Sequence, residues 1–177
     1  VENIMPSSYV TFSDKHNAGI GYTSFEPYGF YQTDFPSMNE AGDFVGMANN
    51  HAAVWKRNGA MIDLGIAGCG ATVSFCGSHG SGINDLGFVV GASTVSSGFN
   101  VYYQQGHQWV NGTVRAVYTG GQSDTLDINN RGDKVTTGIQ ASDYIKHGFV
   151  KSYTGMDYKI GNDATQPSTA VAVSPAG

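Results

Sequence analysis

Short runs of apolar and alternating residues recur along this chain, and turns rich in glycine and asparagine separate them. Runs such as Phe88-Val89-Val90 and Val101-Tyr102-Tyr103 have the β-branched and aromatic residues that favour strands. Asn58-Gly59 stands between two strand-like runs, and Asn-Gly is a strong signal for a hairpin. Good helix formers are scarce. The pattern therefore predicts an all-β protein.

One segment recurs with a period of 45 residues: Met38 to Gly42, then Ile83 to Gly87, then Ile128 to Gly132. In each copy an apolar residue ends a strand, Asn or Asp side chains bond nearby backbone groups, and glycine takes the positive φ that closes the turn. A weaker fourth copy runs from Val173 to Gly177. The residues expected to build the turn are Asn39, Gly42, Asn84, Gly87, Asn129 and Gly132.

The period divides the chain into four units of one repeat domain, residues 1–177. The units are 1–42, 43–87, 88–132 and 133–177. Each unit has room for about four short strands, which is typical of a propeller blade. We therefore predict a β-propeller-like fold of about four blades of roughly 45 residues. A β-solenoid and a part of a larger propeller are the alternatives. The first unit aligns poorly outside its turn, as expected of a terminal repeat.

The second unit carries a longer motif: His51 to Trp55, then Met61 to Gly68, then Ile83 to Gly91. In this order the three segments resemble the HAF repeat family of bacterial extracellular proteins. The match spans most of residues 36–140, and the other units keep mainly the turn and one aromatic strand. The resemblance implies a β-propeller or a related repeat fold and an extracellular, secreted location. It implies no enzyme activity and no catalytic residue.

Composition narrows the classes of function. Charged residues make up 13% of the 177 residues, and the net charge is -5. Without a basic stripe, nucleic acid is not an expected partner. The sequence contains no stretch of 18 apolar residues, so we expect no membrane span. The chain starts at Val1 without a signal sequence, which fits a processed chain or a fragment.

Cys69 and Cys76 lie seven residues apart, and we expect a disulfide between them across a tight hairpin. Two free thiols and a metal-binding pair are the alternatives. The sequence has no further His or Cys at the spacing of a zinc site that would favour a metal. The histidines show no zinc-binding spacing either. Oxygen-rich turns leave calcium open as the only cofactor, although none has the spacing of a calcium-binding loop. The segment from Gly77 to Gly82 predicts a flexible loop.

No nucleophile elbow, phosphate loop or paired catalytic motif is present, so we predict that the chain is not an enzyme. The expected function is that of an extracellular binding or adhesion module, with glycans as candidate ligands. Aromatic side chains could stack on sugars, and the candidates are Trp109, Tyr102 and Tyr103. One alternative is a structural protein that self-associates through strand edges into surface layers or filaments. The other is a hydrolase that uses carboxylates on polysaccharide.

Overall fold

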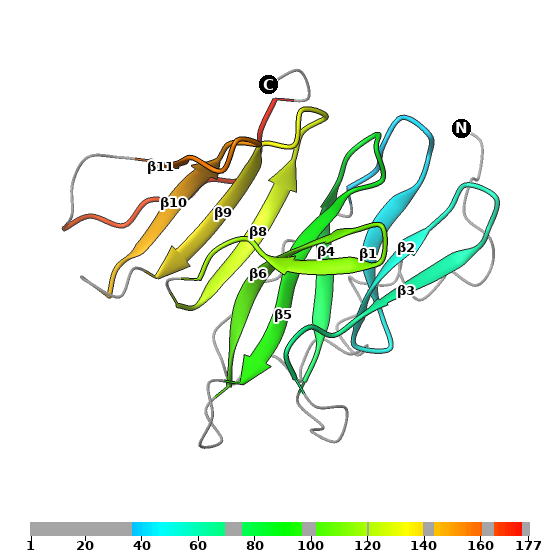
Figure 1. Cartoon of the computed structure of the whole chain (residues 1–177), viewed down its shortest axis with the longest axis horizontal. Coiled ribbons are helices and arrows are strands. Elements are labelled where there is room, and N and C mark those ends of the chain that lie inside the picture. Colours follow the sequence, from blue (N-terminus) through cyan, green and yellow to red (C-terminus); the bar gives the residue numbers. More distant parts are fainter. Residues whose placement is uncertain are drawn as a thin grey trace, which may run out of the picture.

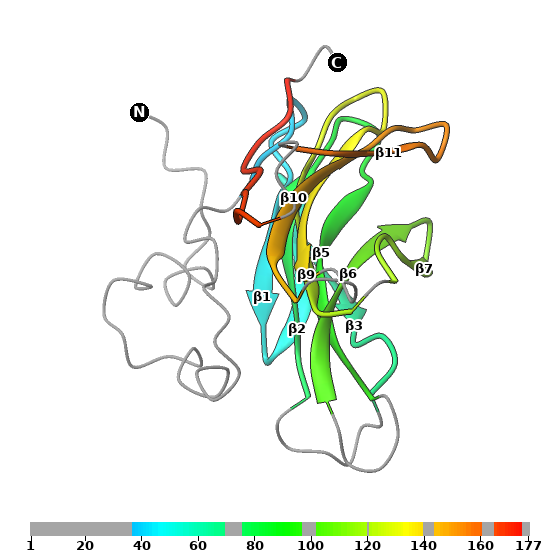
Figure 2. The same cartoon turned by 90° about the vertical axis from the view of Figure 1, so that its left-hand side faces the viewer.

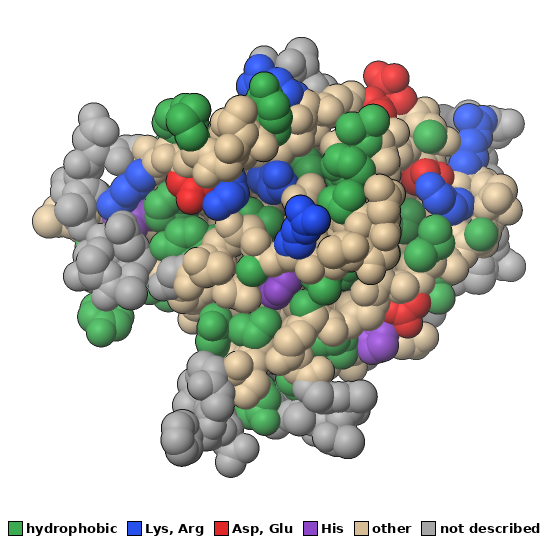
Figure 3. Space-filling model, viewed as in Figure 1, with side chains coloured by type: hydrophobic (Ala, Val, Ile, Leu, Met, Phe, Trp, Pro, Cys, Tyr) green, Lys and Arg blue, Asp and Glu red, His purple; other side chains and the backbone are tan. Residues whose placement is uncertain are grey.

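A computed structural model describes residues 37–69, 76–96, 102–119, 121–139, 144–160 and 165–174. Within these ranges the chain is all-β, as predicted, and its strands form three antiparallel sheets that lie side by side in sequence order (Figure 1). The same residues include no helix of the length and apolarity that a membrane span requires. On the face seen in Figure 3, hydrophobic side chains and uncharged groups separate the charged side chains, except where Lys and Arg gather.

We call the sheets A, B and C. Sheet A has β1 (Phe44–Ala48), β2 (His51–Trp55) and β3 (Met61–Gly65); sheet B has β4 (Ser78–Ile83), β5 (Val89–Ser96), β6 (Tyr102–Val110) and β7 (Thr113–Ala116); sheet C has β8 (Ser123–Ile128), β9 (Lys134–Ile139), β10 (Lys146–Lys151) and β11 (Asp157–Lys159). Strands follow sequence order in each sheet. The boundaries of the repeat units at Gly87 and Gly132 therefore fall between the first and second strands of sheets B and C.

The repeated turn forms as the sequence predicts. In the second copy the Asn84 side chain accepts a hydrogen bond from the Phe88 backbone N–H at 2.9 Å, and the Gly87 N–H donates to the Asn84 carbonyl at 2.9 Å. Gly87 has a φ of 76°, which only glycine adopts without strain. The copies at Asn39 and Asn129 make the same pair of bonds. Each turn thus fixes the start of the strand or bridge that follows it.

Other hairpins follow from asparagine as well. Asn58-Gly59 joins β2 to β3, and Asn111-Gly112 joins β6 to β7 with both residues at positive φ. The Asn111-Gly112 hairpin has the two-residue turn that Asn-Gly favours, whereas Asn58-Gly59 lies in a longer loop in which the Lys56 N–H donates to the Ala60 carbonyl. A third turn, Asn49-Asn50, joins β1 to β2 at φ values of 51° and 64°. That turn was not predicted from the sequence, although Asn is the residue besides Gly that best tolerates positive φ.

The loop expected from Gly77 to Gly82 is wrong, because Ser78–Ile83 is strand β4. Its glycines serve close packing between sheets rather than flexibility. A Cβ on Gly80 would collide with Cγ2 of Val45 in sheet A, and a Cβ on Gly82 would lie 2.9 Å from the Cα of Asp127 in sheet C. β4 therefore lies between its two neighbours, packed against β1 and β2 on one side and β8 on the other.

Serine hydroxyls link each sheet to the next. Ser78, Ser123 and Ser168 are spaced by the 45-residue period, and each lies at the start of a segment that packs on the preceding sheet. Their Oγ atoms accept hydrogen bonds from the backbone N–H groups of Ala52 at 2.7 Å, Gly106 at 2.9 Å and Gly148 at 3.1 Å. Register places these three donors at equivalent positions, three residues before Trp55, Trp109 and Lys151. The inter-sheet contact thus repeats together with the sequence.

The main apolar cluster lies between sheets A and B. It contains Val45, Ala52 and Val54 from sheet A and Ile83, Val89 and Trp109 from sheet B. A smaller cluster of Phe44, Ala53 and Trp55 covers the other face of sheet A, where the Phe44 and Trp55 rings stack at 5.2 Å. Figure 2 shows the sheets edge-on, with the β7 and β11 ends projecting to the same side.

Candidate functional site: the pocket where three repeat turns meet

The three asparagine turns lie next to one another at one end of the sheets (Figure 1). The Asn39 side chain donates from Nδ2 to the Asn84 carbonyl at 3.2 Å, and the Asn84 side chain donates to the Asn129 carbonyl at 3.0 Å. Asn129 turns its own Nδ2 to Asp133 instead, at 3.1 Å. Each asparagine is buried, so these bonds replace water that the amides have lost.

A second set of bonds joins the exposed tips of the turns. The Glu40 N–H donates to Asp85 Oδ1 at 2.8 Å, and the Asp85 N–H donates to Asn130 Oδ1 at 2.9 Å. Asn130 Nδ2 donates to the other oxygen of Asp85. Partners in both sets are separated by 45 residues, so each turn contacts the same place in the next one. Together the bonds hold the turns at fixed spacing.

The turns enclose a pocket of about 210 Å³. Its walls come from equivalent positions of three turns and from the last described segment of the chain; they are Ser37, Met38, Asn39, Glu40, Ile83, Asn84, Asp85, Asp127, Ile128, Asn129, Asn130 and Val173. Asp127 closes one side, because its Oδ2 accepts the Val173 N–H at 2.9 Å. The pocket therefore has acceptor oxygens from the turns together with apolar walls from Met38, Ile83, Ile128 and Val173.

Carboxylates just after the turns stay ionised. Burial alone would raise the pKa of Asp43, but hydrogen bonds from Lys56 and the Arg57 N–H, together with the Lys56 charge, lower it below the usual value. The Lys56 ammonium lies 2.6 Å from Asp43 Oδ2. Asp133 has the same environment, with its pKa lowered against burial by Asn129, the Tyr153 N–H and Arg131. These carboxylates hold the turn to the neighbouring hairpin.

The aromatic candidates from the sequence do not form one site. Trp109 is 4% exposed and belongs to the apolar cluster, so neither face of its indole is open to a sugar. Tyr102 and Tyr103 are half-buried at the other end of β6, with Tyr103 about 20 Å along the strand from Trp109. Their side chains point to opposite faces of sheet B. The turn residues, in contrast, come together as a group.

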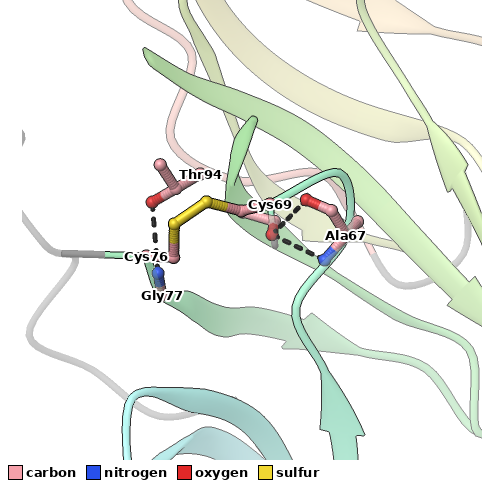
Figure 4. The surroundings of a disulfide bond; sticks show 6 residues. Ala67, Cys69, Cys76, Gly77 and Thr94 are labelled. Atoms are coloured by element: carbon pink, nitrogen blue, oxygen red, sulfur yellow. Dashed lines mark hydrogen bonds between the residues drawn. A yellow bond between two sulfur atoms is a disulfide. The ribbon is translucent and has the colours of Figure 1, made fainter. Parts of the chain in front are cut away.

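Cys69 and Cys76 form the disulfide that the sequence predicts (Figure 4). The prediction that it crosses a tight hairpin is wrong, because Cys69 follows β3 of sheet A and Cys76 precedes β4 of sheet B. The bond therefore lies in the connection between two sheets. Nearby hydrogen bonds tie its flanks to β5: Gly77 N–H to Thr94 Oγ1 at 3.2 Å, and Ala67 N–H to Ser93 Oγ at 2.8 Å.

Four of the five histidines lie in the described ranges, and His16 lies outside them. His79 contacts Asp124 at 3.2 Å between sheets B and C, and His51 contacts Asp63 at 2.9 Å on the surface. Among the described residues no group of three or more His, Cys, Asp or Glu is arranged to hold a metal. The side-chain oxygen atoms of Asp85 accept from the Glu40 N–H and from Asn130 Nδ2, and the side-chain oxygen of Asn84 accepts from the Phe88 N–H.

The arrangement at the pocket can present fixed donors and acceptors to a small polar molecule. It can do so without conformational change, because neighbouring turns already hold the side chains in place. Glu40 extends from the rim, and its side chain is exposed. Comparisons with protein-family models, curated proteins and solved structures found no match to this chain.

Proposed function

We propose that this chain is a non-catalytic extracellular binding module, and that the pocket between the three repeat turns takes a carbohydrate. The observation that supports this function most is the convergence of equivalent residues from three repeats on one cavity of about 210 Å³ with both polar and apolar walls. Ligand sites are concave, largely preformed and few in a protein. The resemblance to HAF repeats and the disulfide, which is favoured in oxidising compartments, both support an extracellular setting.

We further propose that sheets A, B and C are successive blades of a propeller. Two features support this arrangement. Each sheet packs on the next with the same serine contact, and the segment of residues 168–174 lies on sheet C as β4 lies on sheet A. In a propeller the first strands of the blades surround a central axis. The pocket would then lie at one mouth of that axis.

The chemistry of the lining suits a sugar. A hydroxyl group donates one hydrogen bond and accepts others, so it pairs equally with carboxylates and amides. Glu40 and Asn130 offer such groups at the rim, and Met38 offers an apolar surface for the C–H face of a pyranose ring. A neutral monosaccharide or the end of a glycan chain is the ligand class that we infer.

Glycan-array binding tests this function. We expect wild-type protein to bind neutral glycans and a Glu40→Ala variant to lose most of that binding. Glu40 contributes its backbone N–H to the turn contacts, and alanine keeps that group. The matched control is Leu86→Ala, because Leu86 is exposed in the same type of turn but does not line the pocket. A flat array with folded wild-type protein would contradict the proposal, and turnover of a polysaccharide would favour the hydrolase.

Self-association is the second candidate, and strand β3 favours it. β3 is the last strand of sheet A, with its outer edge unpaired among the described strands. Met61 and Ile62 are 48% and 44% exposed on it. An exposed apolar edge invites pairing with another copy. If this is the function, Ile62→Lys should abolish oligomers seen by sedimentation velocity; monomers at high wild-type concentration would contradict it.

A further inference from the structure

A group of basic side chains that do not line the pocket lies between sheets B and C. Lys134 of β9 is the cross-strand partner of Lys151 of β10, so the two side chains share a face of sheet C. Lys159 of β11 is paired with Phe149 of β10, two residues from Lys151, and lies on that face too. This is the face that looks toward sheet B, because a Cβ on Gly138, four residues from Lys134, would lie 3.1 Å from the Tyr118 ring.

Sheet B adds a fourth cation from the facing side. Arg115 of β7 pairs with Gln108, and Gln108 shares its face with Gly106, whose Cβ position meets Thr125 of sheet C. Arg115 is exposed and lies on the projecting β7 hairpin. We call Arg115, Lys134, Lys151 and Lys159 the basic face. Figure 3 shows Lys and Arg side chains gathered over the strands of sheet C and beside β7.

The charge of the basic face is opposite to that of the protein. The whole chain has a net charge of -5, with nine Lys and Arg in total. Four of those nine lie on this face. Asp157 shares it and pairs with Lys151 at 3.1 Å, and the charge of Asp133 also acts on Lys134. The cations of the face outnumber these two carboxylates. An acidic chain that concentrates its cations in this way attracts anions to one place.

The position of Lys134 makes this concentration unfavourable without an anion. Lys134 is 9% exposed, and its ammonium donates to the Gly132 carbonyl at 2.8 Å. Burial lowers its pKa, and the charge of Lys151 lowers it further, against a smaller opposite effect of Asp133. Like charges directly opposite on neighbouring strands destabilise a sheet. An anionic group between the two lysines would change this repulsion into attraction.

We propose that the basic face is a second binding site, which takes an acidic polysaccharide through its sulfate or carboxylate groups. The cations are carried by successive strands of sheet C and by the β7 hairpin of sheet B, so they form a row rather than a single pocket. Neighbouring strands are about 4.8 Å apart. Such a row suits a linear chain with regularly spaced anionic groups, and it does not depend on the sugar pocket.

Nucleic acid fits this face less well. Single strands bind by stacking bases on open aromatic rings beside the cations. On the strands of this face Tyr118 and Phe149 stack on each other at 5.0 Å, and Phe149 is only 8% exposed. Tyr153 is a single exposed ring, in the turn after β10. The face thus offers several cations but no series of open rings. Acidic sugars require only the charge.

Calorimetric titration of the whole chain tests the proposal, with a sulfated heparin-type oligosaccharide as the probe. We expect binding that weakens with salt, and weakens about tenfold or more in the double variant Arg115→Gln, Lys151→Gln, because each cation makes charge-assisted contacts. Lys146→Gln is the matched control. Lys146 is exposed on the same strand β10, but it lies on the opposite face.

Several outcomes would overturn the proposal. These are equal affinity for an unsulfated oligosaccharide of the same length, unchanged affinity in the double variant, or an equal loss in the Lys146→Gln control. Single-stranded DNA of equal charge binding as tightly would assign the face to nucleic acid. A salt-sensitive dimer that the double variant abolishes would assign it to a second copy. Neutral-glycan binding by the double variant reports separately on the pocket.

Discussion

The interface between sheets A and B differs from the interface between sheets B and C. Val45, Val54 and Trp109 form an apolar cluster in the first. In the second, Gly106 packs on Thr125, and His79 contacts Asp124 in a buried pair. Both interfaces nevertheless have the same serine contact to the backbone. The comparison shows that backbone geometry carries the repeat, while side chains can differ from one interface to the next.

The buried histidines of the two interfaces differ as well, because their pKa values are shifted in opposite directions. Burial lowers the pKa of His107, which lies on the face of sheet B toward the apolar cluster, against a smaller effect of its hydrogen bond to the Gln105 carbonyl. Burial also opposes protonation of His79, but the charge of Asp124 and its hydrogen bond outweigh burial and raise the pKa. His107 is therefore stabilised as the neutral ring and His79 as the cation.

The largest expected effect breaks the apolar interface. Trp109→Ala should lower the free energy of unfolding by about 3–5 kcal/mol, because it leaves a cavity between sheets A and B. Gln104→Met, a substitution on the face of sheet B toward sheet C, should change it by less than about 1 kcal/mol, because it removes a buried amide oxygen without a partner among the described residues. Urea unfolding measures both. Equal losses would mean that the two interfaces do not differ in this way.

The disulfide should stabilise the A–B side specifically. Replacing both Cys69 and Cys76 with serine should lower the free energy of unfolding by about 2–3 kcal/mol, as expected for a short closed loop. Hydrogen exchange should become faster in β2 and β4 while β9 changes little. Uniformly faster exchange would instead indicate one cooperative unit without a weaker boundary.

The serine contacts allow a finer comparison. Ser78→Ala should lower the free energy of unfolding by about 2 kcal/mol, because the Ser78 Oγ accepts from Ala52 and also donates to the Gly65 carbonyl at 2.6 Å. Ser123→Ala should lower it by about 1 kcal/mol, since it removes the acceptor of the Gly106 N–H. Thermal unfolding of both variants tests the order. A neutral Ser123→Ala would show that the B–C contact needs no hydroxyl.

The smallest expected effect is a difference in pH dependence. His79 contributes to the free energy of unfolding in full below its ordinary pKa of 6.5, and this contribution is lost as pH rises through the raised pKa of the folded state. The His107 contribution has the opposite sign: it is present above 6.5 and is lost as pH falls through the lowered pKa. Asp124→Asn should remove the alkaline loss and leave the acidic one. Urea unfolding of both proteins across the pH range measures this difference. An alkaline loss of stability that is unchanged in the variant would contradict the assignment to His79.

The sequence was most informative where chemistry is local. The turns at Asn39, Asn84 and Asn129 follow from side-chain bonding within four residues, so the period alone predicts them. The contacts between sheets were not predicted from the sequence. Ser78 and Ser123 have the same period, but their partners Ala52 and Gly106 do not, because the segment that joins β5 to β6 is longer than the turn that joins β1 to β2.

The pocket and the aromatic residues show why the rest could not be predicted. Strand alternation says that Trp109 and Tyr102 face opposite ways, but it does not say which face is covered. The glycines of β4 were interpreted as flexibility because close packing against Val45 is visible only in three dimensions. His79 and Asp124 are separated by one period, which is the signal that could have identified the pair.

The asparagine contacts also bear on how such chains change length during evolution. Asn39 reaches the turn of Asn84, and Asn84 reaches the turn of Asn129, so every boundary depends on the same relation between residues one period apart. A duplication or deletion of 45 residues in frame, wherever in the period it begins, recreates that relation at the new junction. Unequal recombination can therefore lengthen or shorten the array without having to invent a new interface.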